Sequence, residues 1–195
     1  ASRGRNARTA GLLVGALAIM ASGWGLGPLL RPDPGGPSIT IALVQGSVPD
    51  RGLEFNERRS QVLANHVNQT LELARRVEAG ELARPDLVLW PENASDIDPY
   101  TDADAAAAIT SAVQAVGAPI LVGAILDGPG EDHVTNVGIL WSPATGPGEQ
   151  YAKRHPVPFG EYIPLRSIAR KISQDVDLVR RDMVAGTGDG RIDGG

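Results

Sequence analysis

Two short stretches of the sequence place charged side chains where chemistry could occur. In the first, Trp90-Pro91-Glu92-Asn93, a carboxylate directly follows an apolar segment. The apolar Trp90 and Pro91 would partly desolvate Glu92, and desolvation raises the pKa of a carboxyl toward the range of a general base. The alternative is that Glu92 is a solvated loop residue.

The second stretch is a loop spanning residues 151–164, which contains three prolines and one glycine. These residue types favour a rigid, non-helical backbone, and such loops commonly position functional groups. The loop carries Lys153 and Glu161. A lysine beside a carboxylate could stabilise a developing oxyanion. The alternative is a surface salt bridge of little energetic value.

Hydrophobic patterning predicts the elements that position these stretches. Strands are expected at 38–45, 86–90, 119–125 and 134–141, a short fifth strand at 151–153, and helices around 63–77, 101–116 and 168–172. The second helix should begin at a Thr101 cap, with Asp104 three residues on, and bury Ile109, Val113 and Val116. Glu92 then follows a buried strand, at the sheet edge where ligand sites gather. This element order predicts an α/β layered fold.

The segment 9–30 is free of charged residues and long enough to cross a bilayer as a helix. Its flanks favour a cytoplasmic N-terminus, because Arg3, Arg5 and Arg8 precede it, whereas Arg31 and Asp33 follow. A cleaved signal peptide and a buried core helix are the alternatives.

The predicted organisation is a cytoplasmic flank at 1–8, a transmembrane helix at 9–30, a Pro/Gly-rich linker at 31–38 and an extracytoplasmic folded domain at 39–195.

Composition narrows the possible functions. The 195 residues include 18 Lys and Arg against 23 Asp and Glu, a net charge of −5, which argues against a nucleic-acid partner. There is no cysteine, and the three histidines lack metal-ligand spacing, so neither a metal nor another cofactor is expected.

The motifs carry a family resemblance. WPEN (90–93), YAKRHPVPFGEYIP (151–164) and IALVQG (41–46) resemble the carbon-nitrogen hydrolase, or nitrilase, superfamily, and within it the apolipoprotein N-acyltransferases. The stretch 166–186 is similar to the same enzymes, and the resemblance spans about 39–186. It implies an α/β fold, a nitrilase-like αββα sandwich present in part, preceded by the one transmembrane helix.

The resemblance also implies a Glu-Lys-Cys triad. Glu92 corresponds to the general base, Lys153 to the residue that stabilises the oxyanion, and Glu161 to a second carboxylate beside the lysine. Such an enzyme of the bacterial inner membrane transfers an acyl chain from a phospholipid donor, through a cysteine thioester, to the α-amine of a diacylglyceryl lipoprotein. Because this chain lacks cysteine, we expect the nucleophile beyond residue 195, and a truncated chain that is inactive alone.

Two other functions remain open on the sequence. A membrane-anchored amidase or nitrilase would use the same triad, with water as the acceptor. A noncatalytic extracytoplasmic binding domain would need no cysteine at all. The flanking parts of the gene would separate the three.

Overall fold

The computed structural model describes residues 15–16, 18–19, 36–48 and 55–192. The chain divides into two units, Ala1–Ser38 and Ile39–Gly195, and the fold described below belongs to the second. The predicted membrane helix at 9–30 lies almost wholly outside the described residues. In the ranges that are described, no helix has both the length and the apolar character that a bilayer crossing requires.

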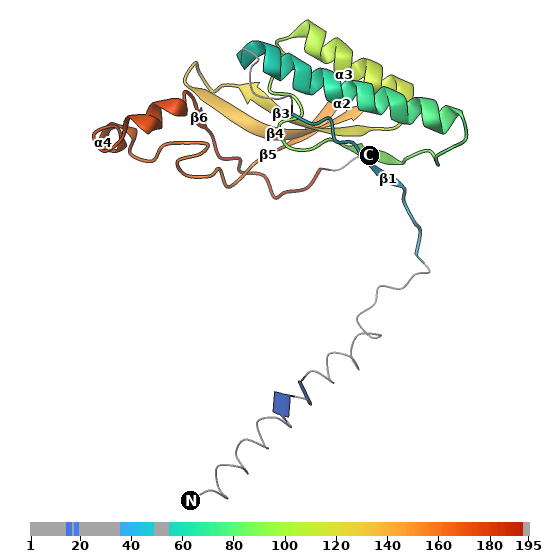
Figure 1. The fold of residues 1–195 in the computed structure, drawn as a ribbon, viewed down its shortest axis with the longest axis horizontal. Helices are drawn as coiled ribbons and strands as arrows, with labels where there is room; N and C mark the ends of the chain where they lie inside the picture. Colours follow the sequence, from blue (N-terminus) through green and yellow to red (C-terminus); the bar gives the residue numbers. More distant parts are fainter. Residues whose placement is uncertain (1–14, 17, 20–35, 49–54, 193–195) are drawn as a thin grey trace, which may run out of the picture. The chain divides into compact units, whose positions relative to one another are not determined.

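One mixed sheet of six strands organises the second unit (Figure 1). The strand order is β1-β2-β3-β4-β5, and β6 pairs with β4. The first three strands are parallel, whereas β3, β4 and β5 form antiparallel pairs. The strands are β1 Ile41–Leu43, β2 Leu87–Leu89, β3 Ile120–Asp127, β4 His133–Ser142, β5 Gly146–Ala152 and β6 Asp182–Met183.

Two helices, α2 (Phe55–Glu78) and α3 (Ala103–Val116), lie together on one face of the sheet (Figure 1). The core lies between them and alternate residues of the central strands, such as the paired Val122 and Ile139, both fully buried. Because side chains alternate along a strand, the neighbouring pair Gly123 and Gly138 faces away from the helices. The described sheet therefore has one face covered by helices and one face without a helical layer.

Helix α3 buries Ile109, Val113 and Val116 as the apolar spacing predicted. Its N-cap, however, is Asp102 rather than Thr101. The Asp102 carboxylate accepts the Ala105 N–H at 2.9 Å, which satisfies one of the free donors of the first turn.

The second half of the chain differs from the predicted elements in two places. Strand β5 begins at Gly146, well before the predicted 151–153, because Pro147 is tolerated on an edge strand that needs no outward N–H. The helix predicted at 168–172 is the single turn α4 (Arg166–Ala169), which buries no residue and so gains little from packing. A short 3-10 helix, η1 (Gln174–Leu178), follows it.

Candidate active site

Trp90 anchors the chain where it leaves β2. Its indole N–H donates to the Thr70 hydroxyl at 2.9 Å, and its ring tilts against His66 with centroids 5.6 Å apart. The Trp90 backbone N–H also donates to the Leu121 carbonyl at 3.0 Å. With 4% of its surface exposed, Trp90 ties the start of the Glu92 loop to both α2 and β3.

Gly123 on β3 makes room for that loop. A Cβ at this position would overlap the Pro91 carbonyl oxygen and lie 2.9 Å from the Glu92 Cα. The chain then rejoins the sheet, where the Ser95 N–H donates to the Gly123 carbonyl at 3.0 Å. The close approach of two backbones at Gly123 therefore determines where Glu92 sits.

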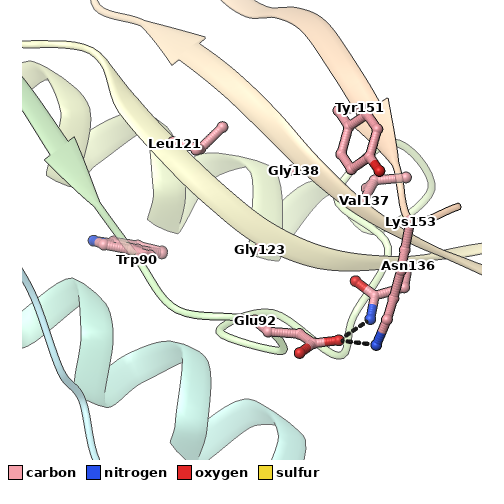
Figure 2. Close-up of a pocket in the computed structure, with 9 residues that line it drawn as sticks. All are labelled: Trp90, Glu92, Leu121, Gly123, Asn136, Val137, Gly138, Tyr151 and Lys153. Carbon is pink, nitrogen blue, oxygen red and sulfur yellow. Dashed lines mark hydrogen bonds and ion pairs between the residues drawn. The ribbon is translucent and has the colours of Figure 1, made fainter. Parts of the chain in front are cut away.

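The structure brings the three predicted site residues together. Lys153 directly follows β5, and its ammonium lies 2.9 Å from Glu92 Oε1 and 2.7 Å from Glu161 Oε1. The other oxygen of Glu161 accepts the Val157 N–H at 2.7 Å. Figure 2 shows Glu92 and Lys153 meeting at one end of a cavity. Their catalytic roles remain predictions.

The C-terminal segment fastens this loop to the sheet. The Gly186 N–H donates to the Lys153 carbonyl and the Met183 N–H donates to the Glu161 carbonyl, each at 2.8 Å. The Lys153 N–H in turn donates to the Asn136 carbonyl of β4 at 2.8 Å. The backbones that carry Lys153 and Glu161 are thus held by neighbouring strands.

The pKa expected for Glu92 from the sequence was wrong in direction. A hydrogen bond from Lys153 lowers the pKa of this carboxyl; burial opposes that effect, and a hydrogen bond from Asn136 adds to it. The side chain remains 53% exposed, so its partial desolvation raises the pKa less than the bond from Lys153 lowers it. Hydrogen bonds to Glu161 and then Glu92 raise the pKa of Lys153. At neutral pH the pair is therefore a carboxylate and an ammonium.

A cavity of about 340 Å³ opens beside this pair, on the sheet face without helices. Its walls are mainly apolar, with the charged groups at one end, as Figure 2 shows. The lining residues are Trp90, Glu92, Leu121, Gly123, Asn136, Val137, Gly138, Tyr151 and Lys153. Among the residues with described positions, no group of three or more His, Cys, Asp or Glu side chains is arranged to hold a metal ion.

The sequence prediction missed Asn136, Gly123 and Tyr151. Asn136 lies on β4 with 5% of its surface exposed and donates a hydrogen bond to Glu92 Oε1. A polar residue inside the apolar run 134–141 was the available signal, since buried amides need partners. The role of Gly123 depends on a close approach between strands that are distant in sequence, and no local pattern announces it.

No family model matches the chain. Among curated proteins, the apolipoprotein N-acyltransferase of Mycolicibacterium smegmatis (strain ATCC 700084 / mc(2)155) is 48% identical over 159 residues, which cover 80% of this chain and 27% of that protein. The protein of the same name from Azotobacter vinelandii (strain DJ / ATCC BAA-1303) is 29% identical, with 91% of this chain and 34% of that protein covered. The chain thus spans about a quarter to a third of these relatives' length.

Among solved structures, a double mutant of the amidase from Nesterenkonia sp. AN1, in complex with acrylamide, is similar at a TM-score of 0.46 and 17% identity. The match covers 81% of this chain and 52% of that one. The carbon-nitrogen hydrolase from Helicobacter pylori G27 has a TM-score of 0.44 at 16% identity, with 62% of this chain and 41% of that one covered.

Proposed function

Since this chain is homologous to apolipoprotein N-acyltransferases across 80% of its length, we propose that it supplies the general base and the cationic residue of such an enzyme. The complete protein would transfer a fatty acyl chain from a membrane phospholipid to the α-amine of a diacylglyceryl-cysteine lipoprotein. The observation that carries the proposal is the Lys153 ammonium between Glu92 and Glu161, beside a cavity. The nucleophile would be a cysteine outside these 195 residues.

In the first half-reaction, Glu92 takes the proton of the cysteine thiol and the sulfur attacks the ester carbonyl of the phospholipid. A carbon-sulfur bond forms, and Lys153 stabilises the negative charge that develops on the carbonyl oxygen. The carbon-oxygen bond to the glycerol then breaks, and the departing oxygen takes the proton from Glu92. The products are a thioester and a lysophospholipid.

In the second half-reaction, the lipoprotein α-amine attacks the thioester carbonyl and passes its proton to Glu92. The carbon-sulfur bond breaks as the amide forms, and Glu92 returns the proton to the sulfur. Glu92 thus acts as base and acid in turn, which a carboxylate can do when each proton transfer is short. Glu161 holds Lys153 in its charged form throughout.

Exposed apolar side chains next to the site support a lipid donor. We name residues 157–178 the apolar arm; it begins four residues before Glu161 and extends through η1. Its exposed large apolar members are Val157, Phe159, Leu165, Ile168, Ile172 and Leu178. Two of them, Phe159 and Ile172, line one mainly apolar pocket, and exposed apolar side chains of this kind suit contact with acyl chains at a membrane. An extracytoplasmic domain at the membrane surface, anchored by residues 9–30, fits this arrangement.

The sheet face without helices supports the finer fold proposal. Ile41 and Leu43 point to that face, since the intervening Ala42 packs against the core, and they are 44% and 79% exposed. We propose that a second sheet covers this face in the complete protein and produces the αββα sandwich. That sheet would also close the cavity beside Glu92.

The test uses the full-length protein that contains this chain, in vesicles of phospholipid with a diacylglyceryl-cysteine peptide. Glu92→Gln should reduce formation of the thioester, followed by mass spectrometry, by about 10²- to 10⁴-fold, because the amide cannot accept the proton. The matched control is Glu78→Gln, at an exposed position of α2. Thioester formation at the wild-type rate would exclude Glu92 as the base, and release of free fatty acid without acylated peptide would indicate a hydrolase instead.

A further inference from the structure

Asn136 occupies a position where an amide is costly unless it is bonded. It lies in the middle of β4, is 5% exposed and has the apolar Val137 and Ile139 nearby on the same strand. Burying an unpaired amide is unfavourable, so the bonds that Asn136 makes should explain its presence. Two of its bonds lead to the catalytic pair: its side-chain N–H₂ donates to Glu92 Oε1 and its backbone carbonyl accepts the Lys153 N–H.

The side-chain bond has a defined direction. The oxygen of Glu92 carries negative charge at neutral pH, since the pKa of Glu92 is lowered. Only the amide nitrogen of Asn136 can face such an oxygen favourably, because the amide oxygen would be repelled. A hydrogen bond to a charged acceptor is also stronger than one between neutral groups. Asn136 is therefore a donor to Glu92.

The two donors share one oxygen of the carboxylate. Lys153 Nζ lies 2.9 Å from Glu92 Oε1, the same atom that accepts the Asn136 bond. Among the described residues, no donor is recorded for the other oxygen, Oε2. A lysine alone would leave the carboxylate free to exchange its two oxygens by rotation about its last torsion. A second donor, fixed by a β-strand, opposes that rotation.

We infer that Asn136 is a positioning residue that pins Oε1 of Glu92 and thereby leaves Oε2 as the oxygen that takes the thiol proton. The inference rests on the proposed function and deepens it. The backbone carbonyl of Asn136 also holds Lys153, by accepting its N–H. One residue of β4 therefore positions both Glu92 and Lys153. A residue with only a structural role would affect stability but not the titration of Glu92.

The experiment compares Asn136→Asp and Asn136→Ala with wild type in the full-length protein, with thioester formation measured from pH 4 to pH 8. Loss of the donor should shift the acid limb of the pH–rate profile to higher pH by about half to one unit. The shift should be larger for Asn136→Asp, because the new carboxylate lies beside Glu92. At pH 7 kcat should fall by about 10- to 100-fold with little change in KM, because the base is misplaced rather than lost. The melting temperature of each variant reports its folding.

The matched control is Asn65→Asp on α2. It also removes a hydrogen bond donated by a side-chain amide, at 3.3 Å to the Ser47 carbonyl, and it adds a charge away from Glu92. It should leave the acid limb in place. An Asn136 variant that folds and keeps the wild-type acid limb and kcat would overturn the inference. If the wild-type protein forms no thioester at any pH, the proposed function fails instead, so the two failures are distinguishable.

Discussion

Lys153 is a single point charge shared by two carboxylates. Its side chain is 28% exposed, and the loop, strand β4 and the C-terminal segment all hold its backbone. The distances of 2.9 Å and 2.7 Å leave the ammonium little freedom. Because hydrogen bonds to Glu161 and Glu92 raise its pKa, Lys153 keeps its charge throughout the neutral range. These properties suit a group that must meet a small, transient negative charge.

In the full-length protein, Lys153→Arg should therefore reduce the rate of the proposed acyl transfer by about 10²-fold or more, even though the charge is kept. The planar guanidinium fork is broader than an ammonium and cannot occupy the space between two carboxylates in the same way. Acyl transfer to the peptide amine, followed by mass spectrometry, measures the effect. Lys171→Arg, at an exposed position of the apolar arm, is the control. Near-normal transfer by the Lys153 variant would refute the oxyanion role.

At the scale of elements, the site depends on how closely the Glu92 loop packs against β3. The loop leaves β2 after Trp90 and returns to the sheet at Ser95, which bridges to Ala124. Between these points the chain lies directly over Gly123. A side chain at position 123 would collide with the backbone of the loop. The position of the Glu92 carboxylate therefore depends on glycine at position 123.

Gly123→Ala should lower the stability of the full-length protein by about 1 to 3 kcal/mol and displace Glu92. Gly138→Ala, directly opposite on β4, is the comparison for stability, because its Cβ would lie 3.4 Å from the Leu121 side chain, at the edge of ordinary contact. Thermal melts should show a clear loss for the first variant and a small change for the second. Equal melting temperatures would show that the loop can shift without cost.

At the scale of the whole domain, Asp182 ties the apolar arm to the sheet. One of its oxygens accepts the Ile163 N–H at 2.9 Å, and both interact with the Arg166 guanidinium. Burial tends to raise the pKa of Asp182, but the bonds from Arg166 and Ile163 outweigh that effect and hold the pKa below its ordinary value. Arg166 also donates to the carbonyls of Val176 and Val179, which closes the arm on itself.

The arm should loosen in acid. A carboxyl whose pKa is lower in the folded state stabilises that state above its ordinary pKa, and the stabilisation is lost as pH falls through the folded pKa, below about 4 for Asp. Protection of the backbone amides at 163–182 against hydrogen exchange, relative to an unfolded chain at the same pH, should therefore fall below about pH 4. Asp182→Asn should show a comparable loss of protection already at pH 7. Asp189→Asn, an exposed control, should keep the wild-type protection. Unchanged exchange in the first variant would rule out this role.

Local signals in the sequence predicted much of this fold. The order of strands and helices followed from apolar periodicity and from Pro and Gly positions, and the buried residues of α3 were confirmed. The meeting of Glu92 with Lys153 and Glu161 was implied by the family resemblance. The direction predicted for the pKa shift of Glu92 was wrong, because the shift depends on Lys153, which is far along the chain. Asn136 stood out as a polar residue in an apolar run, but its partner Glu92 could not be predicted, because that contact depends on strand register.

The order of the site residues along the chain has a consequence for biosynthesis. Glu92, Asn136, Lys153 and Glu161 all lie within the described domain, and the segment that fastens them ends at Gly186. A ribosome delivers the chain from the N-terminus, and domains form as they emerge. If the proposed cysteine follows this domain, the segments that pair the base with the lysine precede the thiol along the chain and can pack before the thiol joins them. The reactive sulfur would then join a site whose charged residues are already paired.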